Sequence, residues 1–111
     1  MTEMTKETEQ KIGQLQLYEQ SAQSILSQKQ QFQMQLVEIE SALSELEKSE
    51  EAYKIIGNIM VASKKEDLKT DLNSKKDIVS LRLKTLEKQE NQIKEKAEKL
   101  QAEVLKKIKN D

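Results

Sequence analysis

The side chains that could do chemistry in this sequence are almost entirely carboxylates and amines. The 111 residues include no cysteine and no histidine, so thiolate, imidazole and disulfide chemistry are absent together. Two acidic pairs, Glu50-Glu51 and Glu66-Asp67, are explained most simply as solvated helix faces or as favourable charge at a helix start. The sequence contains no phosphate-binding loop and no nucleophile beside a base. It therefore predicts a protein that is not an enzyme and that has no catalytic residues, bound metal or cofactor.

Apolar association is the chemistry that remains, and it is concentrated in the uncharged run Ile55-Ile56-Gly57-Asn58-Ile59-Met60-Val61-Ala62-Ser63. Its central Gly-Asn pair suits a two-residue turn that needs a positive φ, and β-branched residues flank the pair. We therefore expect a β-hairpin over residues 53–62, with an apolar turn of helix as the alternative. An isolated hairpin is marginal in water, so its faces need cover from other chains. The expected oligomerisation residues are Tyr53, Ile55, Ile56, Gly57, Asn58, Ile59, Met60 and Val61.

Charged, proline-free segments on both sides of this run carry heptad repeats. They predict a mainly α fold, in which helices over 5–51 and 64–109 pair as a long antiparallel two-helix coiled coil with a central hairpin. Ser63-Lys64-Lys65-Glu66 matches a capping box, which would start the second helix at Lys64. The expected seam comprises Leu15, Tyr18, Ala22, Ile25, Phe32, Leu36, Ile39, Leu43, Leu46 and Tyr53 on the first side, with Lys29 and Glu50 interrupting. On the second side it comprises Leu72, Val79, Leu83, Leu86, Ile93, Ala97, Leu100 and Val104, with Lys76 and Glu90 interrupting.

The position of the turn also predicts which residues face each other. If its centre lies between residues 57 and 58, the numbers of facing residues sum to 115, which pairs Phe32 with Leu83 and Leu36 with Val79. Lys29 and Glu90 then fall in adjacent layers. A polar pair inside a coiled coil specifies alignment at a cost in stability, so we interpret this pair as a candidate register lock. The alternative is that both side chains reach solvent past the narrow seam.

Composition limits the other possibilities. Charged residues make up 35% of the chain and aromatic residues 3%, which is too little bulky apolar material for an ordinary globular core. Residues 1–63 hold 5 Lys and 10 acids, whereas residues 64–111 hold 14 Lys and Arg and 10 acids, so the two halves would attract each other if they lay side by side. A pI near 5.7 argues against nucleic-acid binding. No apolar run is long enough to span a membrane and no secretory signal is recognisable, so we expect a cytoplasmic protein.

Apolar residues near the two chain ends exceed what the seam needs, and such surface is a candidate binding site. Scattered surface apolar residues are also normal, which is the simpler explanation for any one of them. The candidate binding residues near the chain ends are Met4, Ile12, Leu15, Leu17, Leu100, Val104, Leu105 and Ile108, and Leu26 has the same character. The basic run that includes Lys106, Lys107 and Lys109 could meet an acidic partner, although a solvated tail is the commoner reason for such a run.

The sequence resembles the β-type subunit of prefoldin over nearly its whole length. The specific part is Ala52-Tyr53-Lys54-Ile55-Ile56-Gly57-Asn58-Ile59-Met60-Val61, placed between two helices of matching length. A single hairpin and a short chain fit the β type, since α-type subunits carry two hairpins and are longer.

This resemblance implies a hexamer of two α-type and four β-type subunits, joined through a β-barrel platform that carries coiled-coil arms. It also implies ATP-independent capture of non-native proteins at the ends of these arms and their transfer to a group II chaperonin, with the lysines above as the chaperonin contact. No nucleic acid or membrane partner is expected. The alternative from another functional class is a coiled-coil spacer or tether that binds no client.

Overall fold

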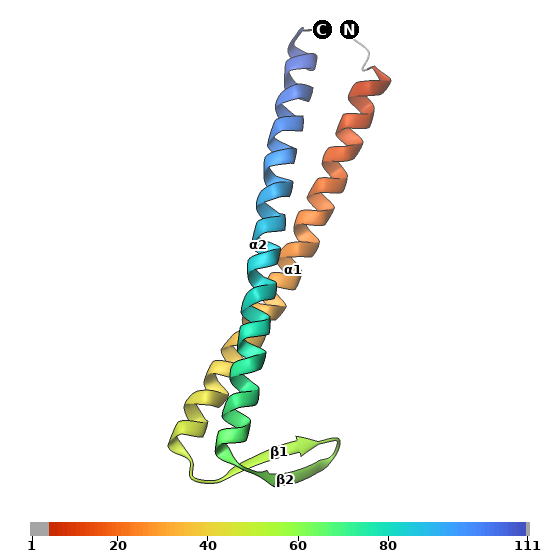
Figure 1. The fold of residues 1–111 in the computed structure, drawn as a ribbon. Coiled ribbons are helices and arrows are strands. Elements are labelled where there is room, and N and C mark those ends of the chain that lie inside the picture. The colour runs from red at the N-terminus through yellow and green to blue at the C-terminus, as the bar shows by residue number, and fades with distance from the viewer. Residues whose placement is uncertain (1–4, 111) are drawn as a thin grey trace. The chain divides into compact units, whose positions relative to one another are not determined.

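The computed structural model describes residues 5–110, and for Asn110 only the backbone. Helix α1 (Lys6–Lys48) is followed by strand β1 (Ala52–Ile56), strand β2 (Ile59–Ser63) and helix α2 (Lys65–Asn110) (Figure 1). This order confirms the predicted fold class of two long helices with an antiparallel hairpin between them. The chain divides into two compact units. We call residues 30–84 the hairpin unit, and residues 5–29 with 85–110 the terminal unit.

The hairpin follows the register predicted from the turn. Ala52 pairs with Ser63, Tyr53 with Ala62, Ile55 with Met60 and Ile56 with Ile59, so each pair of numbers sums to 115. Gly57 has a φ of 59°, and no other described residue has a positive φ. A positive φ at the first turn residue alone is the pattern of a type II′ turn, whose twist matches that of the flanking strands. Glycine is needed here because it reaches this φ without a steric penalty.

Within the hairpin unit, α1 and α2 pack through the predicted seam. Val79 and Leu83 are buried, while Phe32, Leu36, Ile39, Leu43 and Leu72 are half-buried, as a two-helix seam allows. The guanidinium of Arg82 lies 5.7 Å from the centre of the Phe32 ring. Arg82 directly precedes Leu83, the predicted partner of Phe32. Lys76 lies 3.9 Å from Glu40, and Lys69 pairs with Glu47. These contacts keep to the same register as the hairpin.

The terminal unit holds the other stretch of paired helix. Ile25, Leu86 and Val104 are buried there, each 6–7% exposed. The Lys29 ammonium donates to the Glu90 carboxylate at 3.1 Å, so the two interrupting charges meet across the seam. Thr5 caps α1: its Oγ1 accepts a bond from the Thr8 backbone N–H at 3.2 Å. The sequence reading missed this cap.

Three details at the joints correct the predictions. Helix α1 ends at Lys48, so Glu50 and Tyr53 do not continue its seam, and Tyr53 instead lies on β1. The predicted capping box is wrong because Ser63 pairs with Ala52 as the last residue of β2. The carbonyl of Lys64 accepts the first helical bond, from the Leu68 N–H at 3.1 Å, so α2 begins one residue later than predicted.

Candidate protein-binding surfaces

The hairpin carries apolar side chains on both of its faces. Tyr53, Ile55, Met60 and Ala62 belong to cross-strand pairs on one face, because paired residues of an antiparallel ladder point the same way. The other face carries the pairs Lys54 with Val61 and Ile56 with Ile59. The large apolar side chains of the hairpin are 43–69% exposed. Fully burying one such side chain is worth about 1.5–3 kcal/mol, so a partner that covered either face would bind favourably.

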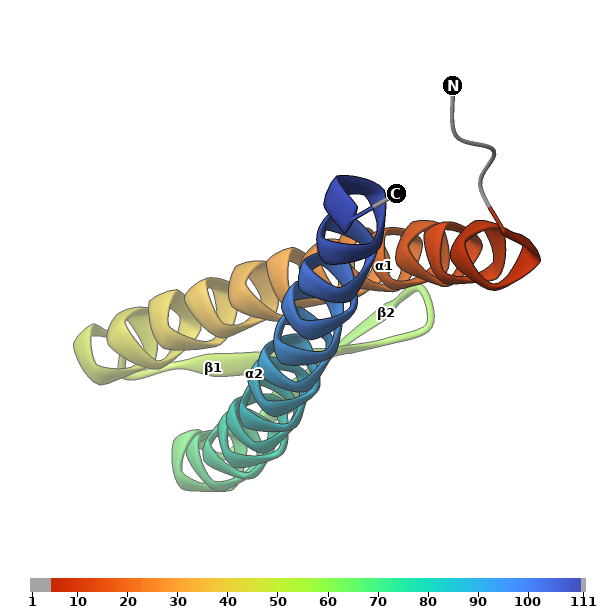
Figure 2. The same ribbon diagram turned by 90° about the horizontal axis from the view of Figure 1, so that it is seen from above.

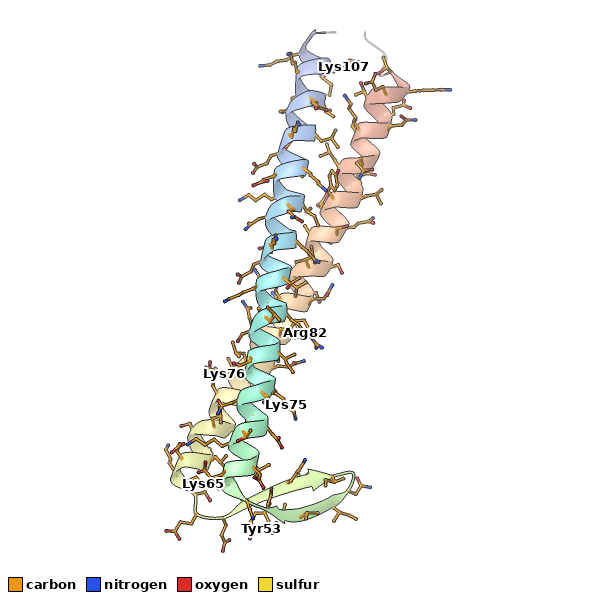
Figure 3. The ribbon with its side chains drawn as sticks, in the orientation of Figure 1. Tyr53, Lys65, Lys75, Lys76, Arg82 and Lys107 are labelled. Carbon is orange, nitrogen blue, oxygen red and sulfur yellow. The ribbon has the colours of Figure 1, made fainter. Side chains whose placement is uncertain are left out.

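Polar contacts position the hairpin relative to the helix ends within its unit. The Ser49 hydroxyl donates to the Glu51 carbonyl at 2.7 Å, and the Tyr53 hydroxyl donates to the Glu51 carboxylate at 3.0 Å. The Lys65 ammonium donates to the Glu47 carbonyl at 3.3 Å, which satisfies one of the open carbonyls at the end of α1. Tyr53 and Lys65 lie where the strands leave the helices (Figure 3). The hairpin is therefore held at its base, while its far end is exposed.

A groove runs between the hairpin and the two helices of its unit. In Figure 1 the hairpin projects to one side of α2, and the side chains of Lys75 and Arg82 point to that side in Figure 3. Seen from above in Figure 2, the hairpin crosses behind α2. The groove has a volume of about 650 Å³. Its walls are formed by Ala42 and Leu46 of α1, Tyr53, Lys54 and Ile55 of β1, and Leu68, Asp71, Leu72, Ser74, Lys75 and Ile78 of α2. Strand β1 and the two helices thus share a hollow lined by apolar and by charged side chains.

The terminal unit presents some of the predicted client-binding residues and buries one. Leu17, Leu105 and Ile108 are 51–56% exposed, and Leu26 is 48% exposed. Ile12, Leu15 and Leu100 are half-buried, and Leu15 and Leu100 are residues of the predicted seam. Val104 is 6% exposed, so its side chain is buried, as its place in the predicted seam implies, and is not presented on the surface of this chain. Met4 lies outside the described residues.

In the basic run at the end of α2, two lysines are exposed to solvent and one forms an ion pair. Lys106 and Lys109 are exposed, whereas Lys107 is half-buried and donates to the Glu7 carboxylate at 3.4 Å. Lys107 is labelled beside the start of α1 in Figure 3. Lys107, and then Lys11, hold the pKa of Glu7 below its ordinary value of 4.5. Of the three predicted chaperonin contacts, Lys107 is therefore already engaged within the chain.

Exposed apolar residues also occur on the helices of the hairpin unit, where no binding surface was predicted. Met34 and Val37 on α1 are 65% and 63% exposed, and Ile78 and Leu81 on α2 are 51% and 66% exposed. All four belong to the hairpin unit and lie off the seam. The signal that revealed the residues near the termini, apolar types outside the heptad stripe, would have found these as well. Among residues 5–110, no helix has an apolar stretch that could cross a bilayer.

Two long helices joined by a two-stranded ladder, with exposed apolar side chains on both faces of that ladder, define the class of antiparallel coiled coils with an inserted β-hairpin. The sequence profile described as "Prefoldin subunit" matches residues 9–111. The chain is 36% identical over 99 residues to the prefoldin subunit beta of Archaeoglobus fulgidus, covering 86% of this chain and 85% of that one. It is 37% identical over 102 residues to the prefoldin subunit beta of Methanothrix thermoacetophila, covering 89% and 85% of the two chains.

A solved structure agrees with these matches. The prefoldin beta subunit from Thermococcus strain KS-1 superposes with a TM-score of 0.88 at 32% identity, covering 94% of each chain. The chain therefore belongs to the prefoldin family of chaperone subunits, and the relatives named here are of the beta type.

Proposed function

We propose that this chain is the β-type subunit of an ATP-independent holdase that captures non-native proteins and passes them to a group II chaperonin in the cytoplasm. It would work in a hexamer of two α-type and four β-type subunits, joined through the hairpins. The observation that carries the proposal is the uneven exposure of apolar side chains. They are exposed on the hairpin, where subunits would join, and again near the chain ends, where Leu17, Leu105 and Ile108 face solvent.

Capture on such surfaces needs no chemical step. Each terminal unit offers a small apolar surface whose contacts with a client are weak and exchange quickly. Several such surfaces on one hexamer would bind one client together, because the first contact makes the later ones intramolecular and raises their effective concentration. A folded client would leave, since it no longer exposes the apolar segments that bind.

The proposal predicts that the exposed apolar residues of the terminal unit are needed for capture. Leu17→Ser, Leu105→Ser and Ile108→Ser, combined, should remove most of the suppression of client aggregation measured by light scattering. Their side chains are more than half exposed, so the helices should keep their stability. The matched control combines Gln16→Ser, Gln92→Ser and Gln101→Ser, at exposed polar positions of the same unit, and should keep full activity.

The same assay separates the holdase from the spacer or tether. A tether would leave client aggregation unchanged even in the unmodified oligomer. Full activity in the triple apolar variant, with an oligomer of unchanged mass, would contradict capture through the terminal unit. These substitutions are a sharper test than deleting the chain ends, because a deletion from Leu100 onward would also remove the buried Val104.

A further inference from the structure

Two exposed apolar patches lie on the hairpin unit, one on each helix. Patch A is Met34 and Val37 on α1, and patch B is Ile78 and Leu81 on α2. Met34 is midway between the seam residues Phe32 and Leu36, and Leu81 is midway between Val79 and Leu83. An α-helix turns by about 100° per residue, so a residue two positions from the seam lies on the far side of its helix. The two patches therefore face away from each other, on opposite sides of the hairpin unit.

The patches also lie at the same distance from the hairpin. The hairpin register and the ion pairs of this unit place residues level when their numbers sum to about 115. Met34 and Leu81 meet that condition, and so do Val37 and Ile78. Two copies standing side by side with their hairpins at the same end would bring patch A of one copy level with patch B of the next.

Patch B is continuous with the hollow under the hairpin. Ile78 belongs to patch B and also lines the groove together with Tyr53 and Ile55. A helix laid along patch B would thus contact the hairpin as well. The proposed association through the hairpins would bring neighbouring copies close to this groove.

The charges of the two helices favour α1 of a second copy as the helix that lies along patch B. Residues 30–47 of α1 carry four glutamates and no lysine or arginine, whereas residues 65–84 of α2 carry six cations and four acids. Glu40 and Glu47 are already paired with lysines of α2 in the same chain. Glu38 and Glu45 make no ion pair within the described residues, and neither do Lys75 and Lys84. A second copy can therefore present an acidic α1 to a basic α2.

We infer that patch A of one copy docks on patch B of a second copy that stands beside it with its hairpin at the same end. Neighbouring chains then contact each other through their helices as well as through their hairpins. This inference rests on the hairpin assembly proposed above. Because the two patches differ and face opposite ways, the contact is heterologous: it joins one surface of the first copy to a different surface of the second. The helices near the hairpins would then hold one another at a set spacing.

The absence of cysteine makes a direct test possible. Full-length chains with Met34→Cys and full-length chains with Leu81→Cys are mixed, assembled with an α-type subunit and oxidised, so that any disulfide must join two chains. The control replaces the second chain by Ser74→Cys, an exposed position of α2 one heptad nearer the hairpin. Cysteines with Cα atoms more than about 7 Å apart do not bridge, so we expect about tenfold more disulfide between positions 34 and 81 than between 34 and 74.

Each outcome decides the question. A dominant disulfide between positions 34 and 81 supports the contact. Equal yields in both mixtures, a dominant symmetric disulfide between two copies of position 34, or a crosslink from position 34 to a cysteine-bearing client would overturn it. Native mass spectrometry of the same samples reports the hairpin assembly separately: an intact oligomer without the disulfide refutes the helix contact alone, whereas loss of the oligomer refutes the proposed assembly beneath it.

Discussion

The Lys29–Glu90 ion pair should determine the alignment of the helices more than their stability. The Lys29 and Glu90 side chains are 15% and 33% exposed, and their atoms meet at 3.1 Å. By the register of the turn, Lys29 faces Leu86 and Glu90 faces Ile25, and both of these apolar residues are only 7% exposed. The charges therefore join diagonally across a buried layer of the terminal unit.

A slip of one heptad would separate the two charges. Lys29 would then face Ile93 or Val79, and Glu90 would face Phe32 or Tyr18, so both charges would lie against apolar partners. A buried charge that loses its partner costs about 3–5 kcal/mol, and partial exposure reduces that figure here to about 1–3 kcal/mol. Even the lower value disfavours the slipped alignment several-fold. Lys29→Met alone should lower the free energy of unfolding by a similar amount.

The double variant Lys29→Leu with Glu90→Leu should behave differently. Replacing a buried ion pair by apolar residues is often neutral or stabilising by about 1–4 kcal/mol, so we expect an unchanged or higher thermal midpoint. We also expect a loss of unique alignment, because a leucine fits equally well one heptad away.

Disulfide trapping reads the alignment directly. Ala22→Cys with Ile93→Cys reports the native alignment, since these positions face each other, whereas Ala22→Cys with Leu100→Cys reports a slip of one heptad. The slipped disulfide should form only in the background of the double leucine variant. If that variant still forms the native disulfide alone, the ion pair does not set the register, and the remaining apolar layers do.

Further predictions concern the turn, the effect of pH and the end of α2. Gly57→Ala should destabilise the hairpin by roughly 1–2 kcal/mol, because alanine disfavours the positive φ. Gly13→Ala should stabilise helix α1 by roughly 0.5–1 kcal/mol, because alanine is the better helix former. Neither added methyl group meets an atom within 4 Å, so thermal melts of the two variants compare backbone effects alone. The hydrogen bond from Lys69, and then its charge, lower the pKa of Glu47 below its ordinary value of 4.5. The contribution of this ion pair to stability is therefore present above pH 4.5 and is lost as the pH falls through the lowered pKa. Glu47→Gln should accordingly flatten the acid side of a plot of thermal midpoint against pH, and an identical plot would exclude this contribution. Lys106→Glu with Lys109→Glu should weaken chaperonin binding in surface plasmon resonance while client capture persists; unchanged chaperonin affinity would exclude these two lysines from the contact.

Much of this fold could be predicted because its signals are local and repeat along the chain. The heptad spacing identified the seam residues of both helices, and the Gly57-Asn58 pair located the turn. Together they predicted the register, because a short turn fixes which residues face each other. The same count placed Lys29 and Glu90 in adjacent layers, and the structure shows that they meet.

The joints between elements were harder to predict because two local preferences compete there. Ser63 can cap a helix or extend a strand, and pairing with Ala52 kept it in the strand. Tyr53 continued the heptad spacing, yet α1 had already ended at Lys48. Val104 satisfied two patterns at once, and only the packing showed that its side chain is buried. Met34 and Ile78 lie outside the heptad stripe, so the pattern that singled out the residues near the termini applies to them equally.

The register of the hairpin restricts how chains of this kind can change length during evolution. Residues of the two helices face each other when they are equally far along the chain from the same two-residue turn. An insertion in one helix therefore shifts every residue beyond it relative to the facing residues of the other helix. An insertion can be tolerated where the opposite helix gains the same number of residues at the same level, and multiples of seven also preserve the seam. Natural relatives of different length should therefore differ by compensated pairs of insertions, and designers who wish to lengthen the arms should add one heptad to each helix.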